Sequence, residues 1–300
     1  MMKIWNMVLI LSTFLLCIFG TFLTRSGIVS SVHAFAQSPI GPFFSSFLFI
    51  LIGSCLYLLL TRLDALKSEN RLDSVVSRES SFLFNNLALL GSMFAVLWGT
   101  IFPIISEFFQ NEKRTVSAPF YNKVEVPIGL FLLFLTGVGP LLAWRKTSVQ
   151  SLRRNFTVPT LTSVVVGILF LVFGMRNFYS FICLVLCVFV ACTILAEFHR
   201  GAQARRRQGE SYAQALWILT FRNTRRYGGY VVHMGMVFLF VGFAGSGFNR
   251  EVQKEMVKGD KVEIGGYTLK LQDIKETENA NFVSEVGIIK VYRDGKEIKT

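Results

Sequence analysis

Long apolar runs separated by short polar connections occupy the chain from its start to about residue 247. Most of these runs approach the roughly 20 residues that an α-helix needs to cross the hydrocarbon core of a bilayer. The pattern therefore predicts an all-α polytopic membrane domain over residues 1–248. We expect seven spans, at Met7–Leu23, Phe43–Leu60, Phe82–Ile105, Pro127–Trp144, Thr160–Gly174, Ser180–Ala196 and Gly229–Gly247.

The pattern changes after the last apolar run, and residues 249–300 are predicted to form an extracytoplasmic β segment. Lys261–Leu271 alternates apolar and polar residues around Gly265 and Gly266, and Ile288–Ile298 alternates around Asp294 and Gly295. Gly-Gly and Asp-Gly pairs between alternating runs are typical of hairpin turns. We expect two antiparallel hairpins here. Because the chain ends just after the second hairpin, we expect this domain to be incomplete.

Basic residues are unevenly distributed over the connections between the predicted spans. The second, fourth and sixth connections carry fifteen Lys and Arg residues, whereas the first, third and fifth carry five. Cytoplasmic loops are enriched in these residues. The distribution predicts a cytoplasmic N-terminus, with His33 and the C-terminal tail on the outer side of the membrane. Within the sixth connection, Tyr212–Phe221 is predicted to be a short interfacial helix.

The composition supports a membrane protein and limits the chemistry. Hydrophobic residues make up 52% of the 300 residues. Basic loops and anionic headgroups account for the net charge of +12, which therefore does not indicate nucleic-acid binding. The five cysteines lie within apolar runs, as buried thiols do, and do not suggest a disulfide framework. Carboxylates are nearly absent from the predicted spans, which argues against a hydrolase or a proton-coupled transporter.

Imidazole is the candidate reactive group, and the chain has three histidines, His33, His199 and His233. His33 lies in a polar crossing between the first two spans, and His199 is expected to be an ordinary polar residue at a helix end. His233 lies about four residues into the seventh span, where a functional role is the default hypothesis. The glycines around it suit either close helix packing or a flat ligand. Imidazole without thiolate or carboxylate partners suits haem iron.

Three segments carry a resemblance to a known family. Leu23–Phe35 (LTRSGIVSSVHAF), Asn223–Gly235 (NTRRYGGYVVHMG) and Val262–Leu271 (VEIGGYTLKL) resemble, in this order, the CcmF/NrfE haem-lyase family. The resemblance covers essentially all 300 residues. It implies a part of a cytochrome c maturation complex that binds haem and promotes its covalent attachment to apocytochrome c.

The resemblance also implies roles for individual residues. His33 corresponds to one of two outward histidines that hold the incoming haem. His233 corresponds to one of two membrane histidines that ligate a resident haem b, which reduces the incoming iron. Arg25, Arg225 and Arg226 are candidate propionate contacts, because guanidinium pairs well with carboxylate. The implied partners are apocytochrome c, a haem chaperone and other maturation subunits, and no catalytic residue is assigned.

The chain departs from the family in one respect. Family members carry a Trp-rich segment with a Trp-Trp-Asp core, and a second histidine for each haem, before the position that matches Leu23; this sequence has neither. We therefore expect a fragment, or a subunit whose partner chain supplies the N-terminal half. Two other classes stay open: a polytopic transporter in which His233 lines a pathway, and a structural subunit that docks other maturation proteins.

Overall fold

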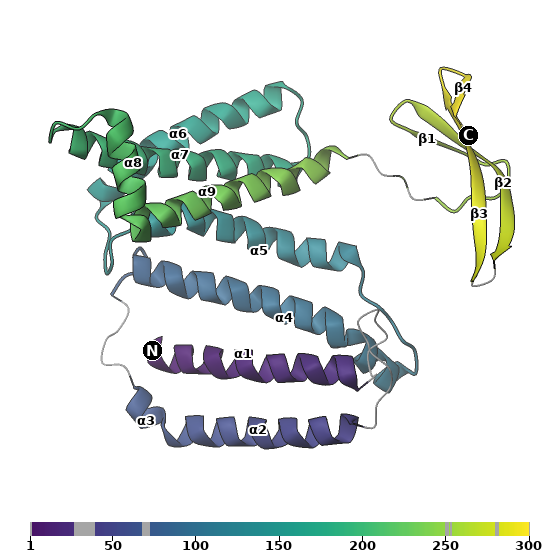
Figure 1. Ribbon diagram of the computed structural model, residues 1–300, viewed down its shortest axis with the longest axis horizontal. Helices are drawn as coiled ribbons and strands as arrows, with labels where there is room; N and C mark the ends of the chain where they lie inside the picture. The colour runs from purple at the N-terminus through teal and green to yellow at the C-terminus, as the bar shows by residue number, and fades with distance from the viewer. Residues whose placement is uncertain are drawn as a thin grey trace.

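The computed structural model describes residues 2–26, 40–67, 73–249, 252, 254–279 and 282–299. Within these residues, helices extend as far as Phe248, and strands follow from Lys261. Seven of the helices are long and apolar enough to cross a membrane. Figure 1 shows these seven helices running alternately in opposite directions, with the strands forming a separate sheet at the end of the chain.

The seven candidate spans confirm the predicted fold class, and each overlaps one predicted span. They are α1 (Met2–Arg25), α2 (Gly41–Thr61), α4 (Arg78–Gln110), α5 (Ala118–Val138), α6 (Val149–Val172), α7 (Phe178–Arg206) and α9 (Thr224–Gly245). Several helices extend beyond the apolar runs, most clearly α7, because their backbone hydrogen bonding continues into the polar flanking sequence. Shorter elements are α3 (Leu63–Leu66), η1 (Gly139–Leu141), α8 (Tyr212–Arg222) and η2 (Ser246–Phe248).

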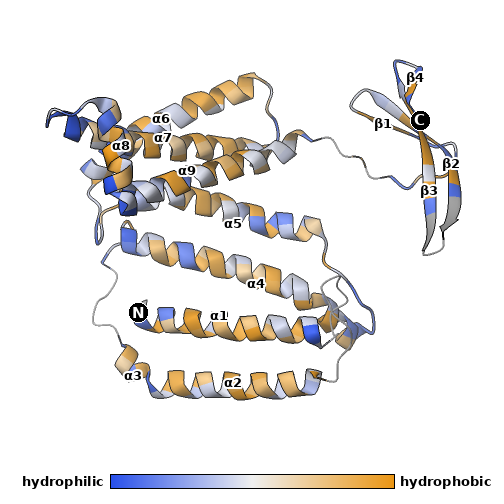
Figure 2. Ribbon diagram, in the orientation of Figure 1, coloured by the Kyte–Doolittle hydropathy of each residue, from blue (hydrophilic) through white to orange (hydrophobic). Residues whose placement is uncertain are grey.

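Hydrophilic residues gather at the helix ends. Figure 2 shows apolar residues along most of each spanning helix and hydrophilic ones near the ends and in the connections. The start of α4, the end of α5 and the start of α9 lie at one side of the bundle, together with α8 (Figure 1). The end of α1 lies at the opposite side. Successive connections therefore alternate between the two sides of the bundle, as the distribution of basic residues predicts. The assignment of one side to the cytoplasm stays a prediction.

α7 is the centre of the helix packing, since it contacts α5, α6, α8 and α9. Its residues Val190 and Thr193 are almost completely buried. α5 approaches α7 closely at Gly137, where an added Cβ would lie 3.0 Å from Val190 Cγ2 and 3.1 Å from Phe189 Cε1. Small residues at such crossings allow membrane helices to pack closely. By contrast, α1 packs mainly on α2.

α8 confirms the short helix expected in the sixth connection. Its buried residues Ala215 and Leu219 face α7 and α9, whereas Trp217 is 67% exposed. The turn before the helix is held by Arg205, whose Nε donates to Glu210 Oε2 at 2.6 Å. This hydrogen bond with a guanidinium lowers the pKa of the Glu210 carboxyl. The exposed Trp217 is placed as an interfacial anchor requires.

The C-terminal strands are β1 (Lys261–Ile264), β2 (Tyr267–Asn279), β3 (Phe282–Arg293) and β4 (Lys296–Lys299), and they form one antiparallel sheet in chain order. The two predicted turns are present. Gly265 and Gly266 have φ of 59° and 84°, and Asp294 and Gly295 have φ of 50° and 78°. Positive φ at both central residues is what a type I′ turn requires. Both predicted hairpins are therefore confirmed.

The pairing of β2 with β3, the longest in the sheet, was not predicted. The register shifts between Leu271 and Asp273, which interrupts the alternation. The sequence Asp273–Asn279 (DIKETEN) is largely polar and shows no alternation of apolar and polar positions. Alternation of apolar and polar residues marks a strand only where one face of the sheet is buried. This part of β2 has no such alternation, so the sequence did not predict its pairing.

Close packing of α5 on α7 is tested by replacing Gly137 with Leu. We expect the free energy of unfolding to fall by about 1–3 kcal/mol, because the new side chain overlaps Val190 and Phe189. Gly53→Leu in α2 is the control, since no atom lies within 4 Å of an added Cβ there. Thermal unfolding in detergent measures both variants. Equal stability of the two would contradict the α5–α7 contact.

Candidate functional site

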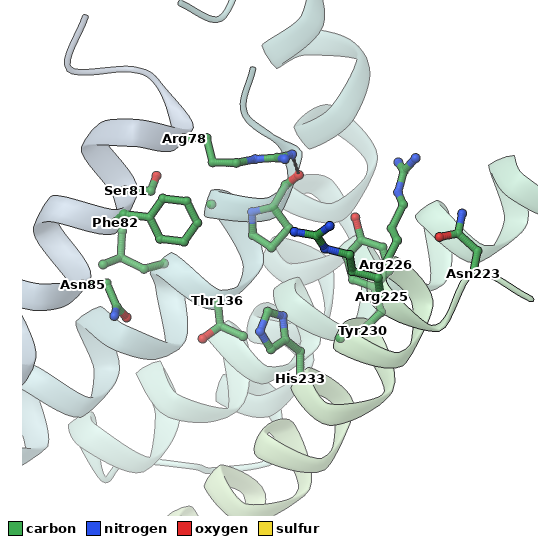
Figure 3. A pocket seen from close by; sticks show the side chains of 14 residues that line it. Arg78, Ser81, Phe82, Asn85, Thr136, Asn223, Arg225, Arg226, Tyr230 and His233 are labelled. Atoms are coloured by element: carbon green, nitrogen blue, oxygen red, sulfur yellow. Dashed lines mark hydrogen bonds between the residues drawn. The ribbon is translucent and has the colours of Figure 1, made fainter. Parts of the chain in front are cut away.

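A cavity of about 760 Å³ lies among α4, α5 and α9 (Figure 3). This volume is in the range of pockets that hold cofactors and other small ligands. The lining residues from α4 are Arg78, Ser81, Phe82 and Asn85; those from α5 and η1 are Leu135, Thr136, Gly139 and Pro140; and those from α9 and the residue before it are Asn223, Arg225, Arg226, Gly229, Tyr230 and His233. The cavity therefore combines segments far apart in the sequence.

Helical periodicity explains why these residues share one cavity. On α9, Arg226, Tyr230 and His233 follow one another at intervals of four and three residues, which places them on one helix face. On α4, Arg78, Phe82 and Asn85 repeat this spacing. The two faces are opposite walls of the cavity.

His233 is the one imidazole among the described residues that line the cavity. Its ring lies beside Thr136 in Figure 3, and its Nδ1 is buried without a hydrogen-bond partner among the described residues. A buried polar atom without a partner costs free energy, and a ligand bound there would remove that cost. α9 begins at Thr224, before the predicted start of the span at Gly229, so His233 lies about 14 Å along the helix from its first residue.

Three guanidinium groups line the same cavity, and their surroundings differ. Arg78 donates from Nη2 to the backbone oxygen of Pro140, while its Nε is buried and has no partner among the described residues. Arg226 donates from Nη2 to Glu197 Oε2 at 2.7 Å. Arg225 is exposed and makes no hydrogen bond or ion pair with a described residue. Two of the three positive charges are therefore without a carboxylate in the described part of the chain.

Glu197 is a buried carboxylate behind the cavity wall, with its side chain 8% exposed. It pairs with Arg226 of α9 and with Arg200 of its own helix, and its Oε2 lies 3.4 Å from the Tyr230 hydroxyl, which donates to it. Arg200 also donates to Asn155 Oδ1 of α6. Ionic and hydrogen-bonding contacts thus join α6, α7 and α9 around one carboxylate.

The position of Glu197 differs from the sequence interpretation, which ended the sixth span at Ala196. α7 continues to Arg206 and includes Glu197 within a candidate span. Glu125 is likewise inside α5, where Ser92 Oγ donates to its Oε2 at 2.7 Å. The spans therefore do contain carboxylates, and each has a hydrogen-bond partner on a neighbouring helix. Glu125 Oε1 is buried without a partner among the described residues.

Of the other predicted residues, Arg25 and His199 lie away from this cavity. His33 falls outside the described residues. Arg25 is in the last turn of α1, at the side of the bundle opposite the start of α9, so the structure does not bring it together with Arg225 and Arg226. His199 is exposed on α7, with Nδ1 3.1 Å from the Tyr212 hydroxyl of α8.

The cysteines behave as packing residues where they are buried. Cys183 and Cys187 of α7 lie against the backbone of α9, with Sγ 3.4 Å from the oxygen of Phe240 and 3.7 Å from that of Val237, respectively. The described residues contain no group of three or more His, Cys, Asp or Glu that could hold a metal ion. Burial agrees with the expectation of structural thiols for Cys183 and Cys187, whereas Cys17 is exposed and Cys55 and Cys192 are half-buried.

Sequence reasoning missed the residues that α4 and α5 bring to the cavity, notably Arg78, Asn85 and Thr136. A partial signal was available, because the predicted topology places the start of the third span and the end of the fourth on the same side as the start of the seventh. Polar residues near those ends could have been grouped. Which of the spans adjoin in space could not be read from the alternation.

Known proteins similar to this chain agree with one another. Residues 247–300 match the family model described as CcmF C-terminal beta-sandwich. The cytochrome c-type biogenesis protein CcmF of Pseudomonas aeruginosa is 33% identical over 304 aligned residues, covering 99% of this chain and 44% of that protein. CcmF of Escherichia coli is 31% identical, with coverage of 98% and 44%. Nearly the whole chain is therefore similar to part of CcmF.

A solved structure titled Cytochrome c Heme Lyase CcmF has the same fold, with a TM-score of 0.61 and 25% sequence identity. The match covers 98% of this chain and 43% of that one. The probable cytochrome c-type biogenesis protein NrfE of Escherichia coli is 29% identical over 150 residues, which cover 49% of this chain and 27% of that protein. The chain thus corresponds to the C-terminal part of CcmF and spans less than half the length of these relatives. The resemblance drawn from its motifs is confirmed.

The buried ionic cluster predicts a specific loss of stability. Glu197→Gln should lower the free energy of unfolding by about 1–3 kcal/mol, because Arg200 and Arg226 lose their shared carboxylate. Glu112→Gln is the matched control, since its pair with Arg114 is exposed and should contribute less. Thermal unfolding in detergent compares the two. A smaller loss for Glu197→Gln than for the control would contradict the role given to the cluster.

Proposed function

We propose that this chain forms the C-terminal part of a haem lyase of cytochrome c maturation, which binds haem and promotes its covalent attachment to apocytochrome c. The cavity carries the proposal, since it combines three guanidinium groups with the buried Nδ1 of His233, which has no hydrogen-bond partner in the described part of the chain. The names of the relatives support it, because they are cytochrome c-type biogenesis proteins and a haem lyase. A purely structural role would not need an imidazole in a cavity of this size.

The residues of the cavity fit a resident haem b. Neutral imidazole nitrogen is a common ligand of haem iron, and His233 offers one. Phe82 and Leu135 supply apolar walls, while Gly229 has open space where a side chain would otherwise lie. Guanidinium groups at the cavity suit propionate carboxylates. A resident haem supplies a one-electron redox centre, which is the chemistry that reduction of an incoming haem needs.

The remaining residues of the proposal belong to a second site. In our proposal His33 ligates the incoming haem on the outer side, and Arg25, at the α1 end that leads into the same connection, contacts its propionates. The second axial ligand of each haem comes from the part of CcmF that this chain does not match. The proposal therefore places a resident haem near one side of the membrane and an incoming haem at the other side.

Location and partners follow from the same reasoning. The seven apolar helices and the bacterial relatives indicate a multi-pass inner-membrane protein. We propose that His33 and the tail, residues 249–300, lie in the periplasm, which the distribution of basic residues supports. The proposed partners are apocytochrome c, a haem chaperone that delivers haem, the other maturation subunits and the N-terminal half of a CcmF protein.

The test is a reduced-minus-oxidised absorption spectrum of the purified chain, expressed alone and together with the N-terminal half of CcmF. We expect the α-band of haem b in the presence of that half, and its loss in His233→Ala, because the iron loses an axial ligand. His199→Ala is the matched control and should keep the band. Copurified haem would also argue against the transporter and the purely structural alternatives. Haem retained in His233→Ala, or absent under both conditions, would contradict the proposal.

A further inference from the structure

The three guanidinium groups of the cavity differ in what they contact. This difference suggests that they do not all bind the ligand. We infer that Arg78 and Arg225 hold the two carboxylates of the bound haem. Glu197 keeps Arg226 out of that role and acts as a positioning residue. The inference rests on the proposed haem site and adds Arg78 to it as a specificity-determining residue.

Arg226 is already compensated within the protein. Its Nη2 donates to Glu197 Oε2 at 2.7 Å, and the Tyr230 hydroxyl reaches the same oxygen. The Glu197 side chain is 8% exposed, so water screens this ion pair little from that side. A ligand carboxylate that approached Arg226 would compete with a carboxylate that is fixed in place. Arg226 therefore offers less to an anionic ligand than its position suggests.

Arg78 is fixed in direction but not compensated in charge. The hydrogen bond from its Nη2 to the Pro140 oxygen ties the guanidinium to η1. Its Nε is buried, and the described residues offer it neither a hydrogen-bond partner nor a carboxylate for an ion pair. A partly buried cation of this kind gains more from a charged acceptor than an exposed one does. A ligand carboxylate at the cavity would be such an acceptor.

Arg225 provides, from the other wall, a second charge that no described carboxylate pairs. It belongs to α9, whereas Arg78 belongs to α4, and Figure 3 shows their side chains extending from different helices at the same end of the cavity. Two guanidinium groups on separate walls suit two separate carboxylates better than one. The Arg225 side chain is exposed, so it can adjust to the ligand that Arg78 has oriented.

These features describe the ligand by its chemistry. It is a flat apolar molecule with two carboxylates at one edge and a metal that an imidazole can bind further inside. His233 lies eight residues after Arg225, or about 12 Å along the helix axis. Haem has carboxylates for the arginines and iron for the imidazole. The phosphate of an anionic lipid shares the attraction to the arginines but has no use for the imidazole.

Haemin and its dimethyl ester separate the contribution of the carboxylates from that of the iron. The chain, copurified with the N-terminal half of CcmF and freed of haem in neutral detergent, is titrated with each compound, and the change in the Soret band gives two dissociation constants. We expect haemin to bind about tenfold or more tightly than the ester, because charge-assisted hydrogen bonds are strong. Arg78→Gln and Arg225→Gln should each bring this ratio closer to one.

Glu197→Gln provides a test with the opposite sign. Release of Arg226 adds a third free cation, so the preference for haemin over its ester should rise above the wild-type ratio, even if the protein is less stable. Arg222→Gln is the control, since this exposed arginine of α8 does not line the cavity and should leave the ratio unchanged. A general weakening of the fold would lower both affinities together and would not move the ratio in opposite directions.

Three results would overturn the inference. Equal binding of haemin and its ester to the wild-type protein, with a Soret band that depends on His233, would overturn the carboxylate clamp and leave the proposed haem site intact. Absence of any His233-dependent binding would overturn the proposed function and the clamp with it. Displacement of haemin from the wild-type protein by phosphatidylglycerol, but not by phosphatidylcholine, would assign Arg78 and Arg225 to a lipid phosphate instead.

Discussion

The arrangement of the helices around the cavity depends on the contacts of one buried carboxylate, that of Glu197. It joins α7 to α9 through Arg226, and α6 joins the same cluster through Asn155 and Arg200. Inside a protein, unpaired charges are costly and paired ones have strict geometry. The cluster therefore fixes how α9 is rotated against α7. That rotation directs His233 and Arg226 toward the cavity.

The cavity derives its character from which charges are paired and which are free. One arginine is paired with a protein carboxylate, and the other two have none among the described residues. An apolar region with an imidazole lies further along the same helix. A cavity with a cationic end and an apolar end suits an amphiphilic ligand. Its two ends orient that ligand even where the walls do not fit the ligand closely. The proposed haem site and carboxylate clamp both follow from this arrangement.

Alternation of the seven helices separates two regions that the sequence places far apart. The start of α9 with its cavity lies at one side of the bundle, and the end of α1 lies at the other. A chain that handles a resident and an incoming haem would need such a separation, with redox chemistry inside the bundle and attachment chemistry outside it. In the proposed function, the part of CcmF that this chain does not match would complete each site.

The amino-acid sequence determined the local features, because each has its own short-range signal. The seven spans follow from apolar length, the hairpin turns from Gly265-Gly266 and Asp294-Gly295, and the interest in His233 from an imidazole within an apolar run. Tertiary structure alone decided that Arg78 of α4 faces α9, that Glu197 is paired inside α7, and that the polar β2 pairs with β3. Contacts between distant segments depend on which helix faces adjoin and on which charges compensate one another. The periodicity of a single segment predicts neither the adjoining faces nor the compensating charges.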